Sequence, residues 1–287
     1  MEALKQETMN QVNNDQLQPF KWVMDLVASG RILIAGCSGS GKSVALKDII
    51  YTLMATSPNT NQFVFIDLKR VELKVFKKAP HTVCYVTEPE EVVKALNVVL
   101  QIIDDRYKRM EMNDELKSSE PNLWVVVDEY ADLTTIGSKS IERAVQRISQ
   151  IGRAAKVNLI LATQRPTRTD VLKGAIDVNL DSRLALRTVN KQDSRNILGC
   201  PGAEELPDYG KAIMQIKGKN QVIDIPFLEM DELQARVNAW HDTPRVYQNP
   251  EVPTYSATRR QSPNVRVYST DIYGNRRELR YNERVIG

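Results

Sequence analysis

Continuous runs of apolar residues alternate along the chain with segments whose apolar positions repeat at helical spacing. Each run is short and lacks the polar–apolar alternation of a half-exposed strand, which is typical of strands buried on both faces of a parallel sheet. Strands that alternate with helices predict an α/β fold with a doubly wound, mostly parallel sheet. The predicted strands are residues 31–35, 62–67, 81–86, 123–127, 157–163 and 182–188.

The segments at helical spacing predict the helices that cover this sheet. Thr87 and Glu90 stand three residues apart before an apolar run, which predicts a capping box with Thr87 as the N-cap. Residues 211–216 and 221–227 alternate apolar and polar positions around Gly218, which predicts a C-terminal β-hairpin before the last helix. The predicted helices are 19–29, about 42 to 50, about 88 to 112, 140–155, 193–198 and 231–240.

The ends of the chain differ in composition from the part that carries this pattern. Residues 1–19 are rich in Gln and Asn and have little periodicity, so we expect a flexible N-terminal arm. Residues 20–247 are expected to form the α/β domain, because 287 residues with 42% hydrophobic content suffice for one such domain of substantial size. Residues 248–287 are polar and basic, and we expect a mostly disordered tail.

Composition also indicates the cellular compartment in which the protein is found. No apolar run is long enough to cross a bilayer, and the N-terminus lacks an apolar signal core, so we expect neither membrane insertion nor secretion. The three cysteines, Cys37, Cys84 and Cys200, lie far apart and have no metal-ligand spacing. They indicate reduced thiols of an intracellular protein, and we expect a cytoplasmic location.

The net charge of +3 conceals an uneven distribution. From Thr254 to the end, seven arginines outnumber three acids, so this segment carries +4 and the rest of the chain about −1. A basic tail on a nearly neutral body favours a polyanionic partner. A solvated tail without a partner accounts for the composition equally well.

The strand predicted at 31–35 leads directly into a segment that fits the pattern G-x-x-x-x-G-K-[ST] in full. In such a loop the backbone N–H groups and the positive end of the following helix hold nucleotide phosphates. Lys42 is expected to reach the β- and γ-phosphates of ATP, and the Ser43 hydroxyl to bind Mg²⁺. The predicted nucleotide-binding residues are Gly36, Cys37, Ser38, Gly39, Ser40, Gly41, Lys42, Ser43 and Val44.

A second nucleotide motif follows at the end of another predicted strand. The apolar run 123–127 passes straight into Asp128 and Glu129, so both acids are expected at the carboxyl end of a buried strand. There Asp128 can hold Mg²⁺ through water, and Glu129 can orient and activate the attacking water. Gln164 stands just past the strand at 157–163, where we expect it to sense the γ-phosphate or its water.

Several segments resemble motifs of one known family. Residues 151–166, IGRAAKVNLILATQRP, closely resemble a signature of the FtsK/SpoIIIE family of DNA translocases. Residues 67–73 are similar to the family's segment after its second strand. The charged side chains of this segment could face the nucleotide. A solvated loop is the alternative, and the spacing of the charged residues favours it slightly. The motifs run in the family's order from about Ile32 to Phe227, which implies a RecA-like P-loop ATPase. The other similar segments are 36–43, 128–133, 193–198 and 202–206.

The resemblance implies an ATP-driven motor that moves double-stranded DNA, without sequence preference, through a homo-oligomeric ring, usually a hexamer. ATP would bind between subunits, and an arginine from the neighbour would stabilise charge during phosphoryl transfer. Arg183 and Arg187 are the candidates and Arg153 is the third; a salt bridge or a surface charge is the alternative for each. The expected catalytic residues are Glu129, Lys42, Gln164, Arg183 and Arg187, with Ser43 and Asp128 as metal ligands.

In such a motor, loops that face the pore hold DNA through its phosphates, in electrostatic and salt-sensitive contacts. Lys69, Arg70, Arg165 and Arg168 are candidate contributors. The tail arginines could add a second binding strip, because they are interleaved with Tyr255, Tyr268, Tyr273 and Tyr281.

Family members of the cell-division and sporulation type carry membrane helices, a long linker, a preceding α/β subdomain and a winged-helix module, none of which we expect in this chain. Cys37 stands where the family usually has threonine, which need not impair phosphate binding because backbone N–H groups make those contacts. We therefore expect a DNA translocase similar to those of mobile elements and phages, which serve DNA transfer or packaging. A protein-translocating secretion ATPase with a related core and a nucleotide-gated assembly module are the alternatives.

Overall fold

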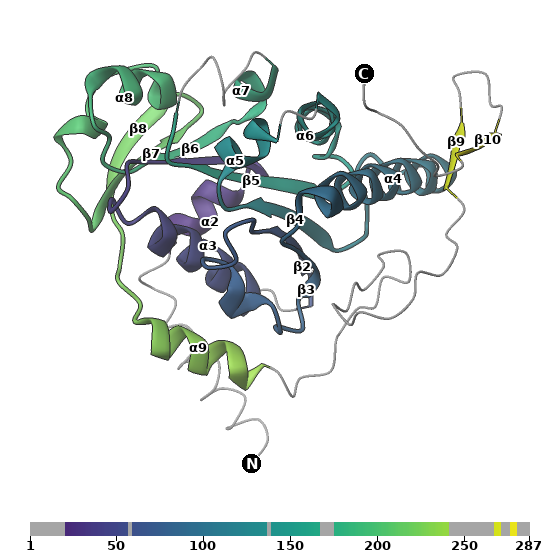
Figure 1. Cartoon of the computed structure of the whole chain (residues 1–287), viewed down its shortest axis with the longest axis horizontal. Coiled ribbons are helices and arrows are strands. Elements are labelled where there is room, and N and C mark those ends of the chain that lie inside the picture. Colours follow the sequence, from purple (N-terminus) through teal and green to yellow (C-terminus); the bar gives the residue numbers. More distant parts are fainter. Residues whose placement is uncertain are drawn as a thin grey trace. The chain divides into compact units, whose positions relative to one another are not determined.

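A computed structural model gives the structure of the protein (Figure 1). The chain divides into two compact units, Met1–Thr254 and Tyr255–Gly287, and each is described by itself. The arm expected at 1–19 and most of the tail expected at 248–287 lie outside the described residues. The structure describes residues 21–56, 59–136, 139–166 and 175–240, together with two short strands at 267–270 and 276–279.

An eight-stranded sheet forms the centre of the first unit. Its strands are β1 Arg31–Ala35, β2 Asn61–Ile66, β3 Thr82–Val86, β4 Asn122–Val127, β5 Val157–Thr163, β6 Ser182–Ala185, β7 Lys211–Ile216 and β8 Lys219–Asp224. They are arranged in the order β3-β2-β4-β5-β1-β6-β7-β8. The first six run parallel, and β7 and β8 are each antiparallel to the strand before them. The predicted α/β fold with a mostly parallel sheet is therefore confirmed.

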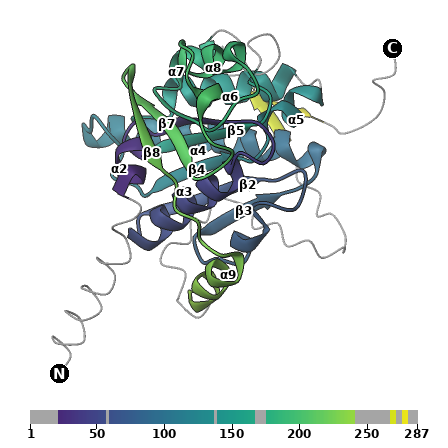
Figure 2. The same ribbon diagram turned by 90° about the vertical axis from the view of Figure 1, so that its left-hand side faces the viewer.

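Helices cover both faces of the sheet (Figures 1 and 2). One face is covered by α2 (Lys21–Val27) and α3 (Lys42–Thr56), and α9 (Met230–Ala239) packs on the same side against α3 and the 3₁₀ helix Lys74–Phe76. The other is covered by α4 (Pro89–Asn113), α5 (Tyr130–Thr135), α6 (Lys139–Ile151) and α8 (Lys191–Leu198). A short helix, α7 (Ala175–Asn179), precedes β6. Among the helices at described positions, none has an apolar stretch that could span a bilayer.

Alternate residues of a central strand reach opposite faces of the sheet. On β1, Ile32 and Ile34 pack on the side of α3, whereas Leu33 and Ala35 pack on the side of α4 and α6, and all four are fully buried. A strand covered on both faces buries nearly all of its side chains, so its residues are mostly apolar. This explains why the sequence shows continuous apolar runs where the strands lie.

The predicted helices differ from the structure at their ends, and α3 runs to Thr56 instead of ending near residue 50. The N-cap of α4 is Glu88 and no side chain caps the helix, so the capping box predicted at Thr87 does not form. α6 ends at Ile151 instead of residue 155. Lys156 adopts a left-handed φ of 52°, and this turn directs the chain into β5.

The C-terminal hairpin also differs in detail from its prediction. Lys217 and Gly218 form its turn, with φ values of 51° and 76°, so β8 begins two residues earlier than expected. Positive φ at both positions is the turn conformation that matches the twist of antiparallel strands. The strand expected at 182–188 ends at Ala185, and the short helices α5 and α7 were not predicted.

The second unit contains one pair of strands at described positions. β9 (Val267–Thr270) and β10 (Arg276–Leu279) pair in an antiparallel ladder. The backbone of this part of the predicted tail therefore forms regular structure.

Candidate active site

The carboxyl ends of β1, β4 and β5 meet at one edge of the sheet. β5 lies between β1 and β4 and pairs with both in parallel. The glycine loop, residues 36–43, leaves β1, while Asp128 and Glu129 follow β4 and Gln164 follows β5. The fold therefore brings the three predicted motifs to one place, where open α/β sheets bind ligands.

The glycine loop turns sharply before α3. The N–H of Cys37 donates to the carbonyl of Arg187 at 2.8 Å, which joins the loop to the end of β6. Gly39 and Gly41 have φ values of 78° and 88°, in a region that side chains other than glycine rarely adopt. α3 begins where the loop ends, so its first N–H groups have no intrahelical acceptor and are available to an anion.

Gly36 is required by close packing. A Cβ at this position would lie 2.6 Å from the Ser40 hydroxyl oxygen and 2.8 Å from the Cβ of Leu186. Both separations are shorter than van der Waals contact, so any side chain here would displace the loop. The Ser40 hydroxyl is buried and has no hydrogen-bond partner among the described residues, which makes it a candidate donor to a phosphate.

Lys42 connects the start of α3 to the end of β4. Its ammonium donates to the backbone carbonyl of Asp128 at 3.0 Å and lies 3.5 Å from a carboxylate oxygen of the same residue. Both side chains are only 4% exposed. The ammonium is thereby held beside the glycine loop, within reach of the phosphates that the loop would bind.

The carboxyl group of Asp128 lies in a crowded acidic environment. Burial raises its pKa, the Lys42 ammonium lowers it, and the carboxylates of Asp67, Glu72 and Glu129 raise it, with a net upward shift. A divalent cation beside this group would offset both burial and repulsion. At the described positions, no three His, Cys, Asp or Glu side chains form a metal site by themselves. A cation here would therefore draw further oxygen ligands from phosphate, hydroxyl and water, as Mg²⁺ does.

Glu129 is held in a fixed orientation by the end of β5. Its carboxylate accepts hydrogen bonds from the Thr163 hydroxyl at 2.7 Å and from the backbone N–H of Gln164 at 3.0 and 3.1 Å. The ammonium of Lys69 lies 3.8 Å from the same carboxylate. The Gln164 side chain is exposed just beyond β5, so the predicted base and the predicted sensor are neighbours.

Asp67 and Glu72 belong to the site, although the sequence favoured a solvated loop for their segment. Asp67 is fully buried, and its carboxylate accepts hydrogen bonds from the N–H of Leu73 at 3.1 Å and the hydroxyl of Tyr85 at 2.8 Å. These bonds fold the segment against α3, where Glu72 accepts a hydrogen bond from Lys47 at 2.8 Å. The resemblance to the family's segment after the second strand was the signal that could have found them.

Glu72 also orients the hydroxyl that is expected to bind metal. Burial by itself would raise the pKa of Glu72, but hydrogen bonds from Lys47 and Ser43 outweigh it, and the pKa is lowered. Because the Ser43 hydroxyl donates to an ionised Glu72, its oxygen lone pairs remain directed elsewhere and are available to a cation.

The three candidate arginines lie in different surroundings. Arg183 is held by contacts within this chain, because its guanidinium donates to the carbonyls of Ile197 and Asp177 and pairs with the Asp177 carboxylate at 2.9 Å. Arg187 is 41% exposed and pairs with Asp208 at 2.9 Å. Arg153 lies in a pocket at the opposite edge of the sheet.

The candidate DNA contacts are spread over the loops at the carboxyl edge. Lys69 lies 3.4 Å from Asp132 in addition to its contact with Glu129, and Arg70 pairs with Glu88. Arg165 is exposed, directly after Gln164. Arg168 and the side chains of the predicted tail lie outside the described residues.

Sequence comparison gives long matches to this chain. A sequence model of the FtsK/SpoIIIE family matches residues 6–118 and 110–168. DNA translocase FtsK of Chlorobaculum tepidum is 37% identical over 236 residues, which cover 74% of this chain and 29% of that protein. DNA translocase SpoIIIE of Bacillus subtilis is 36% identical over 230 residues, which cover 72% and 29%. The chain thus spans less than a third of the length of these relatives.

Solved structures share the fold at lower sequence identity. The pCW3 conjugation coupling protein TcpA, in its monomer form with ATPγS, has a TM-score of 0.65 at 21% identity, over 73% of this chain and 64% of TcpA. ATPases 2 and 3 of EssC from Geobacillus thermodenitrificans have a TM-score of 0.66 at 16% identity, over 79% and 46%. At these identities the likeness concerns the fold alone.

Proposed function

Because this chain belongs to the FtsK/SpoIIIE family, we propose that it is the ATP-hydrolysing motor core of a double-stranded DNA translocase. The observation that carries the proposal is the meeting of the glycine loop, the Asp128–Glu129 pair and Gln164 at one edge of the sheet. The relatives described above are DNA translocases by name, which supports DNA as the substrate. DNA transfer or packaging for a mobile element or a phage is the biological role that we propose.

The glycine loop would hold ATP through its backbone N–H groups, with Lys42 on the β- and γ-phosphates. Ser43 and Asp128 would hold Mg²⁺, because a hydroxyl oriented by Glu72 and a buried carboxylate are the hard oxygen ligands that this ion prefers. When bound, the ion supplies positive charge to the phosphate oxygens as their charge develops.

Glu129 would act as the base that activates water. Thr163 and the N–H of Gln164 occupy part of its carboxylate and fix its direction, which supports a positioned base. The exposed Gln164 side chain would contact the γ-phosphate. Arg165 follows it directly, so a DNA phosphate held by Arg165 would be coupled to the state of the nucleotide.

Arg187 is the candidate that we favour for the γ-phosphate within a homo-oligomeric ring. Its guanidinium is partly exposed and makes a surface ion pair with Asp208, which a phosphate can replace at little cost. Arg183 is occupied by contacts within its own subunit. Mixing inactive Arg187→Ala subunits with inactive Lys42→Ala subunits tests this role: activity returns if the arginine acts across an interface and stays absent if it acts within one subunit.

Glu129→Gln tests the hydrolytic assignment. Removal of a positioned base should lower kcat for ATP hydrolysis by about 10²- to 10⁴-fold while ATP binding is retained. Glu90→Gln is the matched control, because Glu90 is an exposed glutamate in the first turn of α4, which follows β3 and not β4. If Glu129→Gln hydrolyses ATP at the wild-type rate, Glu129 is not the base.

Native mass measurement tests the ring and the partner together. With a non-hydrolysable ATP analogue and duplex DNA, a homo-oligomer with DNA bound is expected, and six subunits is the usual number in the family. A monomer under these conditions would contradict the proposed ring.

A further inference from the structure

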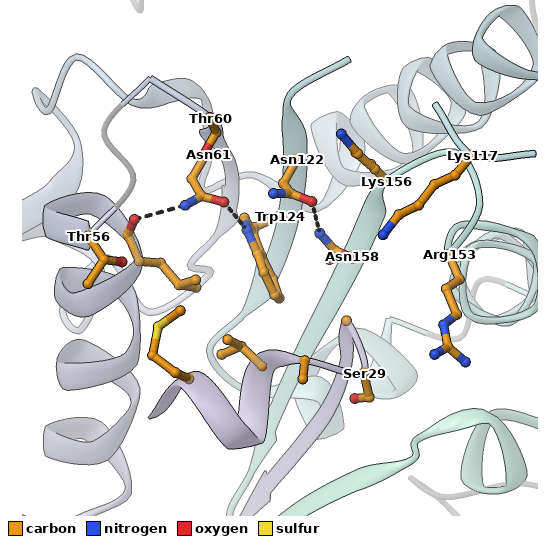
Figure 3. Close-up of a pocket in the computed structure, with 15 residues that line it drawn as sticks. Ser29, Thr56, Thr60, Asn61, Lys117, Asn122, Trp124, Arg153, Lys156 and Asn158 are labelled. Carbon is orange, nitrogen blue, oxygen red and sulfur yellow. Dashed lines mark hydrogen bonds between the residues drawn. The ribbon is translucent and has the colours of Figure 1, made fainter. Parts of the chain in front are cut away.

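A pocket of about 220 Å³ lies at the edge of the sheet opposite the active site (Figure 3). It is lined by residues at the beginnings of β2, β4 and β5, by the turn before β1 and by the last turns of α2 and α3. The glycine loop and Asp128 follow the other ends of the strands. The nucleotide site therefore does not account for this pocket.

Three cationic side chains line the pocket and no acidic one does. Lys117 comes from the loop after α4, and Arg153 and Lys156 come from the turn between α6 and β5. Figure 3 shows them along one side of the pocket. None of the three side chains forms an ion pair within the part of the chain that the structure describes. The Ser118 N–H donates to the Ala154 carbonyl at 2.9 Å, which fixes the two turns against each other.

Amide side chains from three neighbouring strands form a hydrogen-bonded floor. Asn61 accepts a hydrogen bond from the Trp124 indole N–H at 2.9 Å and donates to the carbonyl of Leu53 at 2.9 Å. Asn158 donates to the Asn122 side chain at 3.3 Å. These contacts hold the floor in place, so a ligand would meet a largely preformed site.

Lys156 occupies a backbone conformation that disfavours lysine. Its φ of 52° lies in the left-handed region, where glycine is free of the Cβ clash that every other side chain meets. The turn that requires this φ, between α6 and β5, places the Lys156 side chain at the pocket.

The helix ends at this edge do not cancel the positive charge. α2, α3 and α6 all end at the pocket, and the C-terminus of a helix carries about −0.5 of a charge. Three such ends amount to about −1.5, which is half the formal charge of the three cationic side chains. The pocket is therefore positive overall and suits an anion.

We propose that this pocket binds a phosphate group, either as free phosphate or as the monoester of a small molecule. Its volume is below the roughly 300–1,000 Å³ of sites for drug-sized ligands, so a phosphate with at most a small carbon group fits. The three cationic side chains, of which Lys117 and Arg153 are exposed, would supply charge-assisted hydrogen bonds to the oxygens. Met24 and Val27 form an apolar wall that suits the carbon group of a monoester.

Titration calorimetry at constant ionic strength tests this proposal on the full chain. Lys42→Ala serves as the background, because it weakens phosphate binding at the glycine loop. Into this background we introduce Lys156→Gly, Lys117→Gln or Lys217→Gly. The last is the matched control, because Lys217 is an exposed lysine with a φ of 51° in the β7–β8 turn. Inorganic phosphate, ribose 5-phosphate and a short DNA duplex are the three probes.

The proposal predicts that the background binds inorganic phosphate or ribose 5-phosphate. Lys156→Gly and Lys117→Gln should each weaken this binding about tenfold or more, and Lys217→Gly should not change it. Tighter binding of ribose 5-phosphate identifies a monoester as the ligand, and binding of phosphate alone identifies the free ion. The proposal is overturned if neither small probe binds, if Lys217→Gly weakens binding equally, or if only duplex DNA responds to the pocket variants.

Discussion

Asp48 on α3 makes the stability of this domain depend on pH. Its side chain is 1% exposed, and neither carboxylate oxygen has a hydrogen-bond partner among the described residues. Burial raises its pKa from 3.8 to about 8. At pH 7 the folded domain therefore keeps Asp48 protonated, whereas the unfolded chain has released the proton.

The free energy of unfolding falls as pH rises from 3.8 to about 8. In this range Asp48 is protonated in the folded state and ionised in the unfolded state, so a higher pH favours unfolding. Each pH unit corresponds to ~1.4 kcal/mol, so the interval between 3.8 and pH 7 lowers stability by about 4 kcal/mol. Above about pH 8 both states are ionised and the loss levels off. A loss of this size is a large fraction of the roughly 5–15 kcal/mol that stabilises a typical domain.

His81 acts in the opposite direction and sets the pH range of the assay. Burial lowers its pKa from 6.5 to about 4, so the folded domain resists protonation and loses stability as pH falls through that interval. Between pH 7 and pH 8 the folded and unfolded states both keep His81 mainly neutral. Of these two groups, only Asp48 therefore makes the free energy of unfolding depend on pH in that range.

Asp48→Asn removes the titrating proton with little change of shape. Urea unfolding at several pH values from 7 to 8 should give the wild type a decline of about 1 kcal/mol over that interval, because folded Asp48 itself begins to ionise near pH 8, and the variant no such decline. At pH 7 the variant should be more stable by about 4 kcal/mol. Asp25→Asn, exposed on the neighbouring helix α2, is the control and should keep the wild-type slope. Equal slopes for wild type and Asp48→Asn would refute the reasoning.

Three further substitutions test other parts of the structure. Gly36→Ala should abolish detectable ATP binding in a fluorescent-nucleotide assay, because its Cβ would lie 2.6 Å from the Ser40 oxygen; unchanged affinity would contradict the packing argument. Lys156→Gly should raise the free energy of unfolding by about 1 kcal/mol, because glycine relieves the left-handed backbone; chemical denaturation measures this, and a loss of stability would contradict it. Trp240→Ala should lower the free energy of unfolding by about 2 kcal/mol in the same assay, because the ring stacks on Tyr51 at 5.4 Å; no loss would show that this contact does not anchor α9.

The sequence predicted the strands and site motifs because their signals are local. The run from Leu123 to Val127 ends in two acids, and this pattern is visible whatever lies beside it. The strand order was not predictable in the same way, because runs buried on both faces resemble one another. Nothing in the sequence of β5 shows that it lies between β1 and β4, yet this placement brings Gln164 to Glu129.

The residues that the sequence did not reveal depend on contacts between distant segments. Asp48 directly follows Lys47 in α3, and two charged residues in a row give no sign that the second one is buried. Lys117 and Lys156 come from two separate turns that meet only in the folded domain. Glu72 approaches Ser43 only because buried Asp67 folds its segment back.

The central claim, a motor driven by ATP on duplex DNA, is tested most directly by the rate of ATP hydrolysis with and without DNA. We predict that a long duplex of arbitrary sequence stimulates hydrolysis at low salt, that the stimulation declines as salt is raised, and that an unfolded polypeptide has no such effect. No stimulation by duplex DNA at low salt, or stimulation by polypeptide in its place, would contradict the account.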